Sequence, residues 1–195
     1  RFLFYWHKCK VPQPHRRLTS AMVRADGGII LIDAGEGTQM GISSSGWTAK
    51  SISTILITHL HADHVLGLAG VLLQIHNSCR QRELIIAGPK GIRRYVNSLY
   101  LVLPTLKFPI YFIELTGESD FILTNTLEID AFRLNHSISC YGYSFYLRHV
   151  GKFDVEKAKS VPKRAWENCQ KDSLQEISRE IKSEMTDFRS RKKRD

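Results

Sequence analysis

The sequence contains no closely spaced pair of cysteines and no apolar stretch long enough to cross a bilayer. Its four cysteines are scattered along the chain: Cys9, Cys79, Cys140 and Cys169. Without a Cys-x-x-Cys pair or a signal peptide, such cysteines indicate reduced thiols in the cytoplasm rather than a disulfide framework. The longest apolar runs, such as Val65 to Leu73, are far shorter than the roughly 20 residues of a transmembrane helix. We therefore expect a cytoplasmic protein with no membrane partner.

Acidic residues are also few relative to basic ones. The 195 residues include 28 Lys and Arg against 19 Asp and Glu, which gives a net charge of +9 at pH 7. This excess favours an anionic partner such as nucleic acid, although a solvated basic surface would produce the same composition. Apolar residues make up 43% of the chain, which is typical of a globular domain. The chain starts at Arg1 and its first methionine is Met22, so we expect a fragment.

Alternating strand and helix patterns predict an α/β fold. Apolar runs on either side of a Gly-rich turn, 18–25 and 29–35, predict a hairpin. Further strands are expected over 1–6, 52–59, 83–89 and four segments between 108 and 149, and helices over 65–75 and 91–103. Because strands dominate and helices lie between them, we expect a sandwich of two sheets with helices outside.

Residues 151–195 are highly charged and poor in strand patterns. A capping box at Ser173 and Glu176, followed by an apolar stripe, predicts a helix over 174–188 with a basic end. We therefore expect a main domain over 1–160 and a charged helical segment with a basic tail over 161–195. A surface helix packed on its own domain and an RNA- or partner-binding appendage both fit this pattern.

The stretch "THLHADHVLGL" (58–68) has the composition of a metal-binding loop. Its His-x-His-x-Asp-His pattern arises by chance in about one in a thousand chains of this length and composition. Neutral imidazoles with a carboxylate suit Zn²⁺, or Mn²⁺ as a second choice. We expect His59 and His61 to serve one metal, and Asp63 and His64 a neighbouring one. A closed structural zinc site and a chance cluster of histidines are the alternatives.

Two further residues are candidates for the same site. His136 ends a predicted strand and is the best candidate for an additional metal ligand. Asp33, in "IDAGEGTQ" (32–39), also ends a strand and could accept hydrogen bonds from the metal loop. Taken alone, His136 fits a structural histidine, and Asp33 fits an ordinary Asp-Gly turn.

Together these segments resemble the metallo-β-lactamase superfamily, whose signature is the His-x-His-x-Asp-His loop. Within it they are most similar to ribonuclease Z, the tRNA 3′-processing endonuclease. "IDAGEGTQ" is similar to that family's Asp-Cys-Gly-Glu-Gly-Thr-Gln, and "ITHLHADHVLGLAGVL" (57–72) to its Thr-His-x-His-x-Asp-His-x-x-Gly-Leu-x-Gly-Leu. "AGPKGI" (87–92), "NHSISCYGYSF" (135–145) and "VPQPHRRLTS" (11–20) match further landmarks. The likeness covers about residues 2–170.

The resemblance implies the N-terminal part of a metallo-β-lactamase-like αββα sandwich, which is thus incomplete. The helical basic tail expected from the sequence pattern is unrelated to the family. It implies a hydrolase, an endoribonuclease that processes the 3′ end of precursor tRNA by attack of a metal-activated hydroxide on phosphorus. One or two Zn²⁺ ions per chain, or Mn²⁺, would be held by His59, His61, Asp63, His64 and His136. Asp63 would also act as general base, and the implied phosphate contacts are Arg16, Arg17, Lys90, Arg93 and Arg94. A homodimer is implied as well.

The sequence departs from the family pattern in three places. The family's first strand carries Phe-Leu-Gly-Thr-Gly, whereas this one reads "FLFYWHKCK" (2–10). The metal-bridging Asp with the last metal His, and the general-acid His, have no counterpart after His136. We therefore expect the chain to be inactive or impaired by itself. The alternatives are a catalytically impaired remnant that binds RNA or a partner chain, and another hydrolase of this fold acting on thioesters, lactams or cyclic nucleotides.

Overall fold

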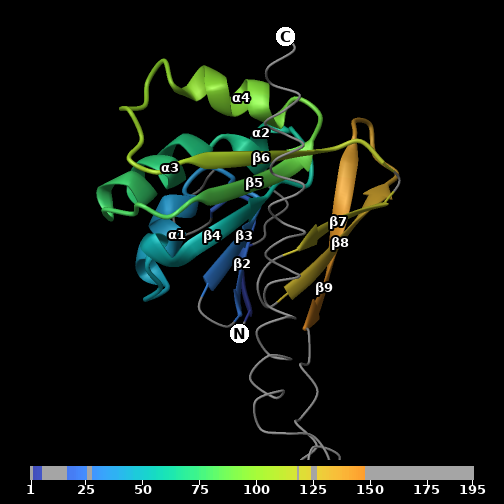
Figure 1. Ribbon diagram of the computed structural model, residues 1–195, viewed down its shortest axis with the longest axis horizontal. Helices are drawn as coiled ribbons and strands as arrows, with labels where there is room; N and C mark the ends of the chain where they lie inside the picture. The colour runs from blue at the N-terminus through green and yellow to red at the C-terminus, as the bar shows by residue number, and fades with distance from the viewer. Residues whose placement is uncertain (1, 6–16, 26–27, 118, 124–126, 148–195) are drawn as a thin grey trace, which may run out of the picture. The chain divides into compact units, whose positions relative to one another are not determined.

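Figure 1 shows the computed structural model of the chain, which describes residues 2–5, 17–25, 28–117, 119–123 and 127–147. Nearly all of them belong to one compact unit, formed by Arg1–Ile122 and Ile129–Phe145. The helix expected over 174–188 and the domain boundary expected at residue 160 lie outside the described residues, so both stay predictions.

The larger sheet has six strands that follow one another in sequence order. They are β1 (Phe2–Tyr5), β2 (Ser20–Ala25), β3 (Gly28–Ile32), β4 (Ile52–Leu56), β5 (Leu84–Pro89) and β6 (Ile110–Leu115). The pairs β1–β2 and β2–β3 are antiparallel, so the expected hairpin is confirmed, and the remaining pairs are parallel. The carboxyl ends of β3, β4 and β5 therefore meet at one edge of the sheet, the place where open α/β sheets bind ligands.

Helices connect the parallel strands and cover one face of the larger sheet (Figure 1). They are α1 (Thr38–Ser44), the 3₁₀ turn η1 (Ala49–Ser51), α2 (Ala62–Val65), α3 (Leu68–Asn77) and α4 (Ile92–Leu99). Helix α3 buries Leu68, Val71, Leu72 and Ile75, whose spacing of three and four places them on one helix face. They join a single core cluster with alternate strand residues such as Leu31, Ile55 and Ile86.

The other face of the central strands is buried as well. Ile30, Leu56 and Ala87 alternate with the core-cluster residues of β3, β4 and β5, and each is at most 3% exposed. Such strands, apolar on both faces, are typical of the middle layer of a sandwich. The second sheet has the order β7 (Ser119–Leu123), β8 (Leu127–Leu134), β9 (Cys140–Leu147), and its Ile129 and Ala131 are fully buried.

The element boundaries differ from the sequence predictions in two places near the site. The strand expected over 52–59 ends at Leu56, so the histidines lie in the loop after it. The helix expected over 65–75 is two helices, α2 and α3, that meet at Leu66 and Gly67. Within the described residues, no helix is long and apolar enough to pass through a membrane.

Candidate metal centre

Three histidines from separate parts of the chain converge at the carboxyl edge of the larger sheet. His59 follows β4, His61 precedes α2, and His136 lies in the loop between β8 and β9. The ring centroids are 4.8 Å apart for His59 and His61, 4.7 Å for His59 and His136, and 5.1 Å for His61 and His136. One ligand atom from each of the three histidines lies within 4.8 Å of the others. In the described part of the chain, this is the one group of three or more such ligand residues.

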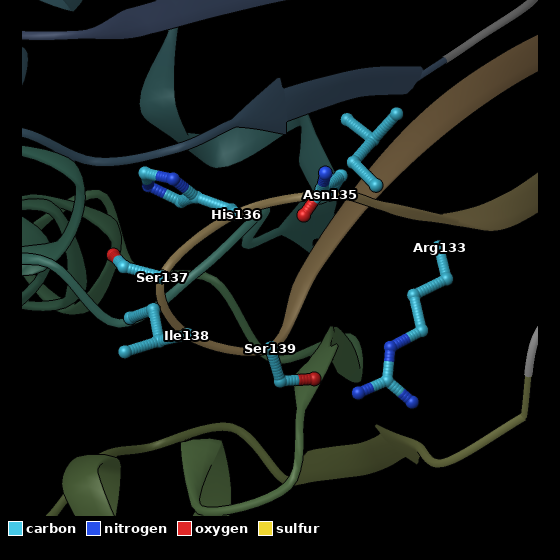
Figure 2. A pocket seen from close by; sticks show the side chains of 7 residues that line it. Arg133, Asn135, His136, Ser137, Ile138 and Ser139 are labelled. Atoms are coloured by element: carbon cyan, nitrogen blue, oxygen red, sulfur yellow. The ribbon is translucent and has the colours of Figure 1, made fainter.

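The loop that carries His136 also borders an open cavity of about 430 Å³. Figure 2 shows that the His136 ring, from this loop, and the side chain of Arg133, near the end of β8, point in different directions. Asn135, Ser137 and Ser139 supply amide and hydroxyl groups to the same cavity. Polar side chains therefore make up most of the lining of this cavity, together with Leu134 and Ile138.

His64, the third histidine of the motif, is bound to Asp33. Its Nδ1 atom lies 2.7 Å from Asp33 Oδ2, which leaves Nε2 as the ring atom available to a metal. His64 also lies close to His59, with a centroid distance of 4.0 Å. Asp63 Oδ2 lies 3.8 Å from His64 Nε2, so the two residues expected to share a second metal are adjacent. Their role as ligands stays a prediction.

Asp33 is the centre of a hydrogen-bond network under the histidine loop. It is 3% exposed, and its φ of 55° places its backbone in the left-handed region. Its carboxylate accepts from the Thr58 backbone N–H at 2.8 Å, from the Thr58 hydroxyl at 2.9 Å and from His64 Nδ1. The contact to the metal loop expected from the sequence is therefore present.

The surroundings of His59 and His64 shift their pKa values in opposite directions. Burial, reinforced by the neighbouring imidazoles of His64, His136 and His61, lowers the pKa of His59 from 6.5 to about 4. Burial also acts to lower the pKa of His64, but the hydrogen bond and the charge of Asp33 outweigh it and raise that pKa. At neutral pH His59 is consequently a neutral imidazole with a free lone pair, which is the form that binds a metal.

Backbone contacts join the two sequence motifs directly. The Ala34 N–H donates to the His64 carbonyl at 2.7 Å, and the Gly67 N–H donates to the Ala34 carbonyl at 2.8 Å. A Cβ on Gly67 would lie 2.1 Å from the Gly35 carbonyl oxygen, and a Cβ on Gly35 would lie 2.3 Å from the Asp63 carbonyl oxygen. Both positions therefore require glycine, because the backbones of the Asp33 turn and the histidine loop touch.

Thr58, Tyr141 and Tyr143 also hold the site, although the sequence predicted no role for them. The Tyr141 N–H donates to the Thr58 carbonyl at 2.9 Å, and the Tyr143 hydroxyl donates to the Ile57 carbonyl at 2.8 Å. These bonds anchor β9, the strand after the His136 loop, to the residues just before His59. The aromatic residues in "YGYSF" carried no signal beyond strand propensity, because a tertiary contact leaves no local pattern.

The residues predicted to contact RNA fall into two groups. Arg17 precedes β2 and donates to the Ser44 hydroxyl at 3.0 Å, whereas Arg16 lies outside the described residues. At the start of α4, Lys90 and Arg94 are exposed, and the Arg93 guanidinium lies 5.3 Å from the centre of the Phe112 ring. The RNA contacts themselves stay predictions.

The amino end of α4 is itself occupied by a carboxylate of the chain. The Gly91 and Arg93 N–H groups donate to Glu114 Oε1 at 2.8 and 3.3 Å. Any phosphate bound near α4 would therefore be held by side chains rather than by the helix end.

The chemistry of the donors fits a divalent metal. Three imidazoles close enough to share one ion, with a carboxylate and a fourth imidazole beside them, are the nitrogen and oxygen ligands that Zn²⁺ prefers. His59 and His61 would hold the ion from the motif loop, and His136 from the loop between β8 and β9. The ligand set expected from the sequence is thus brought together in space, except that Asp63 and His64 are not part of the three-histidine group.

Comparisons with known proteins agree with this geometry. The family model described as "Anti-Pycsar protein Apyc1" matches residues 15–153. Ribonuclease Z of Lachnospira eligens is 48% identical over 162 residues, which cover 82% of this chain and 53% of that protein. The chain spans about half the length of the curated relatives that it matches.

Solved structures give the same relationship. The crystal structure of the short form of human tRNase Z superposes with a TM-score of 0.69 at 29% identity, covering 77% of this chain and 65% of that one. The metallo-β-lactamase fold protein YhfI from Bacillus subtilis superposes with a TM-score of 0.60 at 13% identity, over 74% of this chain and 56% of that one. The expected fold is therefore confirmed. The chain belongs to the family described as Anti-Pycsar protein Apyc1, has the metallo-β-lactamase fold, and is related to the N-terminal portion of ribonuclease Z.

Proposed function

We propose that the chain supplies the histidine side of the active site of a metal-dependent endoribonuclease that processes the 3′ end of precursor tRNA. The observation that carries this proposal is the convergence of His59, His61 and His136 in a chain 48% identical to a ribonuclease Z. A divalent metal supplies Lewis-acid activation of water and neutralises charge on the scissile phosphate. We name Zn²⁺ as that metal because imidazoles dominate the donor set, with Mn²⁺ as the alternative.

Each residue has a distinct part in this proposal. His59, His61 and His136 bind and orient the metal, and Asp63 with His64 borders a second position. Asp63, whose side chain is 27% exposed, would accept a proton from the attacking water as general base. Asp33 holds His64 by accepting from its Nδ1.

The substrate is held by charge in the same proposal. Arg17 on one side, and Lys90, Arg93 and Arg94 at the start of α4, would meet phosphates of the tRNA, with Arg16 as a further contact. A homodimer, which follows from the resemblance to ribonuclease Z, and a cytoplasmic location, which follows from the scattered cysteines, complete the proposal. Size-exclusion chromatography with light scattering checks the homodimer.

The direct test is a cleavage assay on precursor tRNA with Zn²⁺ or Mn²⁺. The chain offers five of the ligands that a two-metal site with a bridging carboxylate requires, so we expect it to bind zinc and precursor tRNA but to cleave slowly or not at all. Joining residues 1–147 to the remaining part of the Lachnospira eligens enzyme should give cleavage that Asp63→Ala abolishes.

Three results would contradict the proposal. The first is a chain that binds neither zinc nor tRNA, and the second is a joined protein whose cleavage ignores Asp63→Ala. The third is faster hydrolysis of a thioester, a lactam or a cyclic nucleotide than of precursor tRNA. Fast, Asp63-dependent cleavage by the chain alone would instead show that His149, Asp154 or a second copy completes the site.

A further inference from the structure

We propose that Thr58 is a positioning residue that transmits the influence of Asp33 to His59 and so fixes which ring nitrogen of His59 faces the metal. The inference rests on the proposed metal site for its purpose. The proton arrangement it describes, however, belongs to the metal-free chain and can be measured there.

The geometry of the Thr58 hydroxyl sets this arrangement. Its oxygen lies 2.9 Å from Asp33 Oδ2, 3.0 Å from Asp33 Oδ1 and 2.9 Å from His59 Nδ1. A threonine hydroxyl carries one proton and can accept through its lone pairs, whereas an ionised carboxylate can only accept. The single Thr58 proton is therefore directed to Asp33.

It follows that His59 must donate to Thr58. The oxygen of Thr58 is then an acceptor toward the ring, so the proton of the neutral His59 imidazole resides on Nδ1. The lone pair is left on Nε2, the ring atom free to bind an ion. His64 also carries a proton on Nδ1, because this nitrogen donates to Asp33 directly, without an intervening hydroxyl. One carboxylate thus sets the tautomer of two neighbouring imidazoles, one directly and one through a hydroxyl.

The backbone of Thr58 is fixed on both sides, which aims the hydroxyl. Its N–H donates to Asp33 Oδ1 at 2.8 Å, and its carbonyl accepts from the Tyr141 N–H at 2.9 Å. A rigid second partner of this kind is what metal-binding histidines usually require. Without the hydroxyl, a buried Nδ1–H would have no acceptor, and His59 would gain by moving its proton to Nε2, where it blocks the metal.

The test is a long-range ¹H–¹⁵N spectrum of the full, metal-free chain with labelled histidine at neutral pH. In the parent chain we expect His59 to carry its single proton on Nδ1, and the Nδ1 of His64 to carry a proton as well. Thr58→Val keeps the shape of the side chain and removes the hydroxyl, so His59 should shift toward the Nε2–H form while His64 keeps its Nδ1–H. Thr58→Ser, which restores the hydroxyl, should return His59 to the parent pattern. His64 thereby reports in the same spectrum that the variant is folded.

Zinc affinity, measured by competition with a chelator, supplies the second readout. Thr58→Val should weaken binding by about 10- to 100-fold, the usual effect of losing a partner of a metal-bound histidine. Thr58→Ser should change it little, and so should Thr54→Val, which alters another buried threonine of the same segment.

The tautomer of His59 decides the inference whatever the RNA assays give. A parent spectrum with the His59 proton on Nε2 overturns it, and so does a folded Thr58→Val chain that keeps Nδ1–H on His59. If Thr58→Val does not fold, the parent spectrum decides. A chain with the expected tautomers that binds no zinc would remove the proposed function and leave the role of Thr58 intact.

Discussion

At the scale of single residues, Asp33 combines an unusual backbone conformation with three accepted hydrogen bonds. Its φ of 55° is readily entered by glycine, asparagine and aspartate. Glycine would lack the carboxylate that meets Thr58 and His64, and asparagine would place a donor where the site needs an acceptor. Aspartate alone satisfies both demands, which explains why this residue directly follows β3.

The lowered pKa of His59 predicts that the metal-free chain loses stability in mild acid. Between pH 6.5, the ordinary pKa of histidine, and the folded value of about 4, the unfolded chain binds more protons at this position. The free energy of unfolding therefore falls as the pH falls through this window, by at most roughly 3 kcal/mol from this residue. Urea unfolding of the EDTA-treated chain at pH 7 and at pH 4.5 measures the change.

The titration of His64 changes the free energy of unfolding in the opposite direction, so its contribution must be measured apart from that of His59. Its raised pKa contributes stability below the unfolded pKa, and this contribution is lost as the pH rises through the folded value. The control is therefore His59→Gln, which keeps His64 and Asp33. The acid loss should be smaller in that variant than in the parent, and an identical loss in both would contradict the assignment.

At the scale of elements, the join between α2 and α3 depends on the absence of a side chain at Gly67. Gly67→Ala should destabilise the chain by about 3 kcal/mol or more, because its Cβ would lie 2.1 Å from the Gly35 carbonyl oxygen, which belongs to the backbone and not to a flexible side chain. Thermal unfolding and zinc titration both report the change, since the displaced segments are those around Asp33 and the histidines.

A glycine in open space provides the comparison for this variant. Gly46 has a φ of 71° and no atom within 4 Å of an added Cβ. Gly46→Ala should therefore lower the free energy of unfolding by only about 1 kcal/mol, the strain of an alanine in the left-handed conformation. Equal losses in the two variants would show that the close approach at Gly67 is not what matters.

The anchoring of β9 gives a second prediction at this scale. Tyr143→Phe removes the donor to the Ile57 carbonyl and leaves a buried acceptor unpaired, which should cost about 1–3 kcal/mol. Zinc affinity should fall as well, because the bond holds the strand after His136 against the residues before His59. Tyr100→Phe, at an exposed tyrosine after α4, should change neither the unfolding curve nor the zinc titration. A Tyr143→Phe chain with parent zinc affinity would show that β9 is held by other contacts.

The sequence predicted much of this architecture, for reasons that particular elements illustrate. Strands such as β4 and β5 are short apolar runs bounded by polar turns, so their positions are visible locally. The break between α2 and α3 at Gly67 could not be predicted in this way. The apolar periodicity continues across it from Val65 to Ile75, and the break is caused by a contact with Gly35. A contact between two segments that are far apart in the sequence cannot be predicted from a window of neighbouring residues.

The site divides in the same way. His59, His61, Asp63 and His64 form one motif, and His136 was identified by its position at a strand end. Thr58 was quoted within the motif but given no role, because a hydroxyl gains its function only when Asp33 and a ring nitrogen lie on either side of it. The RNA contacts were predicted from the basic residues alone. A sequence shows that such residues are present, but it does not show how they are arranged in space.

At the scale of the whole molecule, the net charge of +9 predicts salt-sensitive binding of tRNA. Replacing Lys90 and Arg94 together by alanine should weaken binding and lower the slope of log affinity against log salt by about one for each lost phosphate contact. Lys107→Ala, just before β6 and so at the opposite edge of the sheet, removes a charge of the same sign and should leave the slope nearly unchanged. A flat salt dependence in the parent chain would exclude a phosphate-dominated interface.

The meeting of His61 with His136, at 5.1 Å between ring centres, has a consequence for how the chain folds. An ion bound to both would be a cross-link that closes a long loop containing β5, β6, β7 and β8. Such a link removes conformations from the unfolded chain and few from the folded one, so it stabilises the native state apart from any chemistry it performs. The hairpin of β2 and β3 forms from neighbouring residues and gains little from this link, whereas β8 and β9 depend on it most. A metal held by His61 and His136 would therefore stabilise the second sheet more than the hairpin of β2 and β3.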